Sequence, residues 1–555
     1  MSNRVRFEQA QRMRAFGRLM PLEGMVPQAT TLSYANFGGG LDMRDVRHGT
    51  PEGSTPFALD TDVSEEDRVR RIHGISTVEI WSELLYPELD VRQVAGHSSL
   101  DYRTELLLFA PPYLGVKNEG TTVWHSLGLT TKAPYGWVNH GGTMLFSNMD
   151  EGVVWKREPG MPAEQTDKVP AALIYASFAG RVILGYGVMS GNVERMGVRW
   201  SAANGDPEDW EGIGEGFELL IDDMSVGDKM VAMHSMGLDF LAVLGRNSVW
   251  LGRRTGLVDR PVDLRPVTPK VGALAQEATC VTQMGVAFLH DSGVHLLGQD
   301  GAVHLLSEPI EAELLPVDYT QLAKYKMGYN PRTKWLYLVT PTETWVLDMQ
   351  AGRWWKMSLK NVAGMAMWGQ QFEGLIWDEP YEGEWEEEEG SWDDASPPQG
   401  DDLDMWFVGQ RSNGSWALGK RQQGLTCYFG ISQTPYYQLP LLQQQTMDRL
   451  FTTQGVVLEY VGNGLLGLRQ PNMDGDYVGT AAYDLPAAER DRVAQLPYVH
   501  TGLGQGIQLD LGTGCVEISK VELVTLPRSG RVIGTPQARF AAADYGHLST
   551  LPGES

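Results

Sequence analysis

The sequence predicts an all-β fold: a β-propeller of six or seven blades with an additional β-sandwich-like platform domain. Two observations carry this prediction, a repeated four-run unit in the middle of the chain and short glycine turns between its runs. The clearest unit, VGDKMVAMHSMGLDFLAVLGRNSVWLG from Val226, recurs as ALAQEATCVTQMGVAFLHDSGVHLLGQDGAVHLLSE from Ala273. Because the turns are too short for helices, consecutive runs should pair antiparallel. A period of roughly 40 residues built from such meanders is typical of a propeller.

Looser copies of the unit lie on both sides of this pair. They begin at Leu106, Trp137, Ala172, Tyr325 and Val362, and the last is completed by DMWFVGQRSNGSWALGK from Asp404. We therefore predict a propeller over residues 101–425. Large aromatic side chains occur late in several units, where they can pack between neighbouring sheets. The alternative is that they form a sugar-binding cage. These rings are Trp124, Trp155, Trp250, Trp345, Trp354 and Trp355.

The regions flanking the repeats differ from them. Residues 1–100 form an N-terminal arm and an irregular segment, and residues 426–555 carry widely separated strands that predict the platform. Within the latter, PAAERDRVAQL from Pro486 can form one short helix.

An acidic segment interrupts the last blade. Residues 381–404, YEGEWEEEEGSWDDASPPQGDDLD, carry about a dozen carboxylates and almost no aliphatic side chains, so we expect an inserted surface loop. A calcium site is the alternative, but the fixed ligand spacing is missing. Trp385 and Trp392 leave a role in docking a partner open.

Composition limits the function classes. The formal net charge of -25, from 70 acids against 45 bases, repels phosphates and disfavours sequence-specific DNA binding. Three cysteines without metal-ligand spacing (Cys280, Cys427 and Cys515) argue against a disulfide scaffold or a zinc site and suit a reducing cytosol. The N-terminus lacks the features of a signal peptide, and no apolar run approaches 18 residues. We therefore expect a protein that is neither secreted by the usual route nor membrane-spanning.

Candidate functional residues have ordinary structural interpretations. Four polar residues could serve chemistry at a propeller's central funnel, but each lies in a predicted turn, where Asp and Arg are common: Asp239, Arg246, Asp291 and Arg332. Three histidines close in sequence could suggest a metal, but a turn separates the first two and strand-surface positions are preferred: His290, His295 and His304.

Two glycine clusters resemble phosphate-binding loops. The third glycine of GIGEGF at Gly212 comes too early for a dinucleotide loop, and no P-loop lysine follows Gly38–Gly40, so turn and strand-start roles are preferred. We predict no catalytic residue, no cofactor-binding residue, no metal ligand and no enzyme activity.

Four segments carry a resemblance to a known family. ANFGGGLDMRDVRHGTPEGSTPFALDTDVSEEDRVRRIHGI from Ala35 resembles the opening of the tail nozzle proteins of short-tailed bacteriophages. The units from Val226 and Gly272 resemble that family's central blades, and TGLGQGIQLDLGTGCVEISKVELVTLPRSGR from Thr501 resembles its platform strand pair. The leader before Ala35 and the acidic segment depart from the family pattern.

The resemblance implies a structural virion protein in the phage tail, made in the host cytoplasm. Six copies would form the distal channel for genome ejection beneath the head-to-tail adaptor. The implied partners are the other copies, the adaptor, a tail fibre or spike, and viral DNA that passes without sequence-specific binding, with the host surface contacted indirectly. The segment 36–74 is expected to reach the adaptor or a neighbouring copy. The alternative function is a glycan-binding or glycan-hydrolysing propeller.

Overall fold

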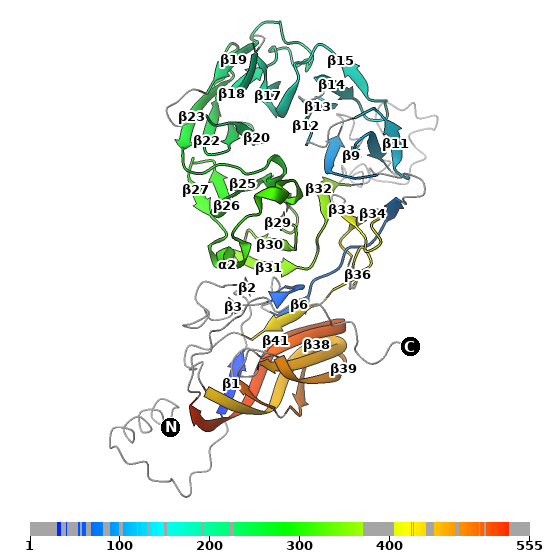
Figure 1. Ribbon diagram of the computed structural model, residues 1–555, viewed down its shortest axis with the longest axis vertical. Coiled ribbons are helices and arrows are strands. Elements are labelled where there is room, and N and C mark those ends of the chain that lie inside the picture. The colour runs from blue at the N-terminus through cyan, green and yellow to red at the C-terminus, as the bar shows by residue number, and fades with distance from the viewer. Residues whose placement is uncertain are drawn as a thin grey trace, which may run out of the picture.

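The computed structural model of the chain describes residues 30–34, 40–41, 54–55, 58–62, 68–81, 89–98, 104–118, 120–129, 134–148, 152–189, 192–220, 227–369, 404–422, 425, 427–433, 435–439, 449–471, 477–498, 500–503 and 507–531. They form a propeller and a platform beside it (Figure 1). No helix among these residues is long and apolar enough to cross a membrane.

Seven four-stranded antiparallel sheets make the blades. Blade 1 holds β8 (Gln93–Ser98), β9 (Thr104–Ala110), β10 (Tyr113–Lys117) and β11 (Val123–Ser126); blade 2 holds β12 (Gly136–His140), β13 (Thr143–Asn148), β14 (Val153–Arg157) and β15 (Glu164–Thr166). Blade 3 holds β16 (Ala172–Phe178), β17 (Arg181–Met189), β18 (Asn192–Trp200) and β19 (Gly216–Leu219); blade 4 holds β20 (Met230–Met236), β21 (Phe240–Gly245), β22 (Val249–Arg254) and β23 (Val262–Thr268).

Blade 5 holds β24 (Thr279–Thr282), β25 (Gly285–His290), β26 (Gly293–Gly298) and β27 (Val303–Leu305). Blade 6 holds β28 (Lys326–Asn330), β29 (Trp335–Val339), β30 (Thr344–Asp348) and β31 (Arg353–Met357). Blade 7 holds β32 (Val362–Trp368), β33 (Asp404–Gln410), β34 (Trp416–Lys420) and β7 (Glu79–Trp81). Within the described ranges, helical residues occur in η1 (Gln276–Ala278), η2 (Glu308–Ile310), α2 (Glu311–Leu314) and η3 (Tyr319–Lys324).

The glycine turns join the strands as predicted. Gly237 has φ 66° in the turn between β20 and β21, a left-handed conformation that glycine adopts without strain. The predicted meanders and the all-β propeller are confirmed, and the blade number is seven.

The ring closes with a strand that precedes the repeats. β7 pairs with β34 through Trp81↔Trp416, so a strand from before blade 1 completes blade 7. β8 likewise lies before residue 101, and Asp404 is the first residue of β33. The sequence-based division at 101 thus placed two propeller strands in the N-terminal region. The rest of the acidic insertion lies outside the described residues.

The first strand of each blade lies innermost, because the first strands of neighbouring blades contact one another around the ring. We define the top face as the side where these strands begin and the bottom face as the side where they end. Antiparallel pairing then places the loops between second and third strands on the top face. Loops between first and second strands, and between third and fourth strands, lie on the bottom face.

The platform is one curved sheet of nine strands. Its central pair is β38 (Arg449–Pro471) and β41 (Gln508–Arg531), flanked on one side by β39 (Tyr477–Leu496) and β40 (His500–Leu503). The other strands are β37 (Tyr436–Gln438), β1 (Thr30–Tyr34), β4 (Ala58–Leu59), β5 (Thr61–Asp62) and β6 (Val69–Arg71). The expected helix from Pro486 is wrong, because those residues belong to β39 and pair with β38.

Glycines bring the two central strands together. Gly462 and Gly514 have φ of 90° and 106°, and a Cβ on Gly462 would lie 1.8 Å from the carbonyl oxygen of Cys515. Only glycine permits this approach. The register of β38 against β39 shifts on both sides of Gly462, and that of β38 against β41 shifts just after Gly464, the partner of Gly514.

The propeller is inserted between two parts of the platform. β1 pairs with β41 although they lie at opposite ends of the described chain, and the described part of segment 36–74 contributes β4, β5 and β6 to the same sheet. Strands β4 and β5 and the short strand β2 (Gly40–Leu41, paired with β3, Ser54–Thr55) contact β31 at the outer edge of blade 6. The short pair β35 (Cys427–Tyr428) and β36 (Ile431–Ser432) follows blade 7.

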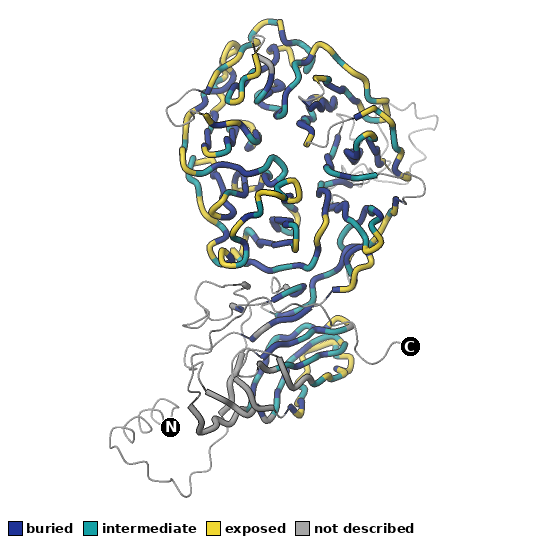
Figure 2. The backbone as a smooth tube through the Cα atoms, viewed as in Figure 1, coloured by how far each residue is buried: buried dark blue, intermediate teal, exposed yellow. Residues whose placement is uncertain are grey.

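Buried residues follow the strands of the blades and of the platform (Figure 2). One cluster runs without interruption from blades 5, 6 and 7 into the platform. The predicted core tryptophans Trp155, Trp250, Trp345, Trp354 and Trp355 are buried, and Trp124 is half-buried against Trp81. The packing interpretation of these rings is confirmed.

Candidate functional site

Polar contacts at the top face join blades that are not immediate neighbours. The Gln276 side chain, just before blade 5, donates to the Leu173 carbonyl of blade 3 at 3.3 Å, passing blade 4. Lys326, at the start of blade 6, pairs with Glu277 and donates to the Arg92 carbonyl beside blade 1 at 2.9 Å, passing blade 7. Each contact thus spans one intervening blade, and we call Gln276, Glu277 and Lys326 the top-face bridge.

Burial affects both charged side chains of the top-face bridge. The Lys326 side chain is 6% exposed, so its ammonium depends on Glu277 and the carbonyl for solvation. Burial raises the pKa of Glu277, although Lys326 opposes the shift. Half-buried positions on the innermost strands below it are uncharged: Leu173, Val231, Cys280 and Met365.

Histidines join neighbouring innermost strands. The rings of His97, His140 and His234 bond across blade boundaries to the Gly142 carbonyl (3.1 Å), the Ser177 hydroxyl (2.8 Å) and the Thr279 hydroxyl (2.7 Å). Burial lowers the pKa of His234 to about 4, so this ring is neutral at pH 7. The three side chains therefore act as hydrogen-bonding links between blades.

Two of the sequence candidates meet at the top face. Arg246 donates to the Leu274 carbonyl at 2.8 Å, and its guanidinium lies 5.4 Å from the centre of the Tyr319 ring. A hydrogen bond with Asp291 raises the pKa of the Tyr319 hydroxyl. Both candidates lie in turns, as predicted, and η3 brings Tyr319 between them. Tyr319 could not be predicted as their neighbour, because no sequence pattern connects it with those two turns.

Of the three histidine candidates, two lie together and the third lies apart. His290 and His295 share the Ser292 hydroxyl at 2.9 and 2.8 Å, and their ring centres lie 5.6 Å apart. Burial lowers the pKa of His295 to about 4. His304 lies on the outermost strand β27, opposite Leu296. Across the described part of the chain, no three His, Cys, Asp or Glu side chains gather as metal ligands.

The remaining candidates are dispersed. Asp239 and Arg332 lie in bottom-face turns of blades 4 and 6. Gly212 lies in the loop that leads to β19 within blade 3, and Gly40 starts β2, while Gly38 and Gly39 lie outside the described residues. Cys280, Cys427 and Cys515 are all free thiols.

A buried ion pair joins blades 1 and 2. Glu105 on β9 accepts two hydrogen bonds from Arg157 on β14, at 3.0 and 3.1 Å, and one from the Gly160 amide at 2.9 Å. Each charged side chain is 4% exposed. Burial would raise the pKa of Glu105, but hydrogen bonds from His97 and Gly160 and the charge of Arg157 lower it overall.

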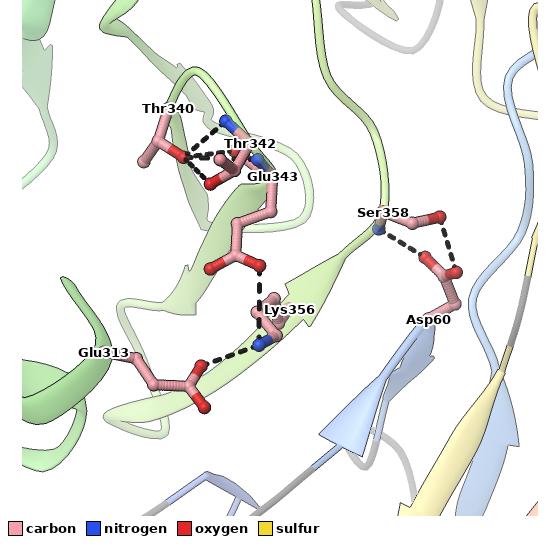
Figure 3. A network of polar contacts seen from close by, with 7 residues as sticks. All are labelled: Asp60, Glu313, Thr340, Thr342, Glu343, Lys356 and Ser358. Carbon is pink, nitrogen blue, oxygen red and sulfur yellow. Dashed lines mark hydrogen bonds and ion pairs between the residues drawn. The ribbon is translucent and has the colours of Figure 1, made fainter. Parts of the chain in front are cut away.

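The contact between propeller and platform centres on Asp60 (Figure 3). This fully buried carboxylate accepts from the Ser358 amide and hydroxyl, both at 2.7 Å, and from the Tyr428 hydroxyl at 2.9 Å. Burial, reinforced by the Asp60 charge, raises the pKa of Tyr428 well above its usual value. Nearby, Arg71 donates to Gln433 and to the Gly512 carbonyl of β41. One set of contacts therefore ties blade 6 to the platform.

A second polar cluster lies beside it. Lys356 on β31 pairs with Glu313 of α2 at 2.6 Å and with Glu343 at 3.4 Å (Figure 3). Burial would lower the pKa of Lys356, but the two carboxylates raise it overall. The Lys356 carbonyl also accepts from the Asp60 amide at 2.8 Å. The two clusters thus share one strand and stabilise the same junction.

No protein-family model and no curated protein matches the chain. Solved propeller structures resemble it. A catalytically inactive virginiamycin B lyase from Staphylococcus aureus, solved with quinupristin, is 9% identical with a TM-score of 0.37, covering 62% of this chain and 99% of that one. A streptogramin B lyase is 10% identical with a TM-score of 0.38, covering 62% and 97%. A chain of the mitotic checkpoint complex is 10% identical with a TM-score of 0.36, covering 62% and 94%.

Proposed function

We propose that the chain is a structural subunit of a short-tailed phage, the tail nozzle, of which six copies form the distal channel for genome ejection. The observation that carries the proposal is the platform. An N-terminal strand pairs with the C-terminal strand β41, and the propeller is inserted between them. This arrangement matches the order implied by the resemblance of the segments from Ala35, Val226 and Thr501.

The long strands suit a channel wall. β38, β39 and β41 have 23, 20 and 24 residues, against about 5–6 in an ordinary strand. Their backbones are held by hydrogen bonds along most of their length, which gives an extended and stiff surface. A channel wall along which DNA moves requires an extended, stiff surface and does not require a ligand-binding pocket.

The platform bears on the path of the DNA, because β38, β39 and β41 are the longest strands among the described residues. We propose that the DNA passes between the copies, along the platforms. Six copies would carry 6 × 25, or 150, formal negative charges, which disfavour adhesion of the phosphate backbone.

The proposal is tested on particles purified from the cells that produce this chain. Quantitative mass spectrometry should find six copies for each particle, and antibodies against the propeller should label the end of the tail distal to the capsid. Absence of the chain from purified particles would refute the proposal. Turnover of oligosaccharides by the purified chain would instead favour the glycan alternative.

A further inference from the structure

The five most exposed large apolar side chains of the described propeller all lie on its bottom face. They come from loops of four consecutive blades, 2 to 5, and all bottom-face loops of these blades belong to the described residues. They are Met161 (59% exposed), Ile213 (84%), Leu238 (79%), Leu257 (64%) and Met284 (56%). We call these five residues the bottom-face tips. Apolar side chains that gather on one face mark an interaction surface more often than scattered ones do.

Two of the bottom-face tips lie in the inner turns, between first and second strands. Leu238 follows Gly237, whose φ of 66° allows the tight turn between β20 and β21. Met284 lies in the turn between β24 and β25, and its amide donates to the Thr282 hydroxyl at 3.2 Å. Both turns join paired strands, so the blade sets the position of each tip.

The other three tips lie in the outer loops, between third and fourth strands. The Met161 carbonyl accepts from the Arg157 side chain of β14. The Ile213 carbonyl accepts from the Ala203 amide at 3.0 Å. These hydrogen bonds hold the outer loops of blades 2 and 3 against their own blades.

Arg181 joins the outer loops of blades 3 and 4. This buried side chain donates to the carbonyls of Gly214 and Val258. The two acceptors directly follow Ile213 and Leu257 in the sequence. Hydrogen-bonded loops therefore hold these apolar side chains in water.

The top face differs from the bottom face. Among the described residues, its strand ends carry the less exposed Val193 and Leu305, and the Tyr319 ring there is packed against the Arg246 guanidinium. The platform lies beside blades 6 and 7 (Figure 1). The bottom-face tips are therefore not a docking surface for the platform of the same chain.

A lipid surface fits the arrangement of the bottom-face tips. The tips stand apart from one another, because they come from four blades and from both inner turns and outer loops. A protein partner would need a separate pocket for each side chain. The boundary between lipid headgroups and acyl chains accepts apolar side chains at any position in one plane. Loops on one face of a disc-shaped propeller can enter such a plane together.

Charged residues beside the tips determine the kind of lipid. Glu211, Asp239 and Asp259 are exposed acids near the tips of blades 3 and 4. Arg254 and Arg260 are exposed on the same side of blade 4. Because both signs of charge are present, the face has no basic surface that would select anionic headgroups. Docking therefore depends on the apolar side chains and suits a zwitterionic bilayer.

We propose that the bottom face of blades 2–5 docks on a lipid bilayer by inserting the bottom-face tips between the headgroups. The bilayer removes the five apolar side chains from water, which drives the docking. This inference goes beyond the proposed function, because it requires neither six copies nor a channel.

The test measures binding of the purified full chain to sucrose-loaded vesicles of phosphatidylcholine by sedimentation. Wild type should bind, and binding should persist in about 0.5 M NaCl, which screens attraction between exposed charges. Leu238→Asp/Met284→Asp should lower the partition coefficient at least about tenfold, because burial of one such side chain contributes about a factor of ten or more. The control Val193→Asp, at the top face and 53% exposed, should leave it unchanged.

Three outcomes of the sedimentation experiment would overturn the inference. Wild type that remains unbound would assign the bottom-face tips to a protein partner. Binding that disappears in the higher salt would mean that charge, and not apolar insertion, holds the chain on the vesicles. Equal losses in the double variant and in Val193→Asp would mean that binding is not specific to the bottom face.

A second measurement reports insertion directly. In a chain with the exposed Cys515 replaced by serine, Leu238→Cys and Val193→Cys are labelled separately with nitrobenzoxadiazole, and the chain without a new cysteine gives the background. Vesicles should shift the emission of the label at position 238 to the blue and leave that at position 193 unchanged. No shift at position 238, or equal shifts at both, would overturn the inference. Neither experiment uses phage particles, so this inference and the proposed function can fail separately.

Discussion

Replacing Glu105 by glutamine is expected to destabilise the propeller strongly. The substitution keeps the shape of the side chain but removes the charge that faces Arg157. It also replaces one of the two acceptor oxygens, which lie 3.0 and 3.1 Å from the Arg157 donors, by an NH2 group that cannot accept. Both side chains are 4% exposed, so water cannot take the lost partner's place. Breaking one member of a buried ion pair costs about 3–5 kcal/mol, and we expect a loss in that range at pH 7.

The assay is urea denaturation followed by tryptophan fluorescence. Asp263→Asn is the matched control, because Asp263 pairs with Arg265 at a similar 3.0 Å but Arg265 is 81% exposed. Exposed pairs contribute about 0–1 kcal/mol, so the control should change little. In Glu105→Gln/Arg157→Met the loss should be smaller than the sum of the single losses, because no uncompensated charge remains buried.

The pH dependence gives an independent check. The folded-state pKa of Glu105 is lowered below 4.5, so its contribution is fully present above that pH and is lost as pH falls through the lowered value. The difference between wild type and Glu105→Gln should therefore shrink in acid. A loss below about 1 kcal/mol at pH 7, or a difference that grows in acid, would refute the assigned role of the pair.

Three further predictions follow from the structure. Asp60→Ala should cost about 3–5 kcal/mol and increase proteolysis at the junction, since the Tyr428 hydroxyl loses its buried acceptor, whereas Asp60→Asn should cost less. Lys326→Met leaves Glu277 buried without its cation; because the pKa of Glu277 is already raised, this variant should gain stability in urea as pH falls from 8 to 5 at about constant ionic strength. Replacing residues 381–403 by a short Gly-Ser linker should shift Tm by less than about 2 °C, because that sequence has few side chains to bury; a larger shift would mean that it packs on the propeller.

The repeated meanders could be predicted because their information is local. The turn at Gly237 and the apolar runs on each side of it specify a hairpin without reference to distant residues. The closing strand β7 could not be predicted in this way. It has three residues, and its partner β34 lies more than 300 positions later.

The helix expected from Pro486 shows tertiary pairing overriding local preference. Ala, Glu, Arg and Gln favour a helix there, but pairing with β38 and burial of Leu485 and Leu496 favour a strand. The N-terminal segment was missed for a related reason. β4, β5 and β6 have two or three residues each; β4 pairs with β37, β6 pairs with β41, and β5 pairs with β6.

The candidate site was only partly visible in the sequence. Arg246 and Asp291 stood out as polar turn residues, but their shared neighbour Tyr319 comes from a different connection between blades. The top-face bridge could not be found from the sequence, because Gln276 and Lys326 meet carbonyl groups, which every residue carries.

The most direct test of the proposed function is the structure of the intact particle by electron cryo-microscopy. We expect six copies around the distal tail channel, with the platforms along the DNA path. A particle without this chain, or one in which DNA runs through the centre of a single propeller, would contradict the account.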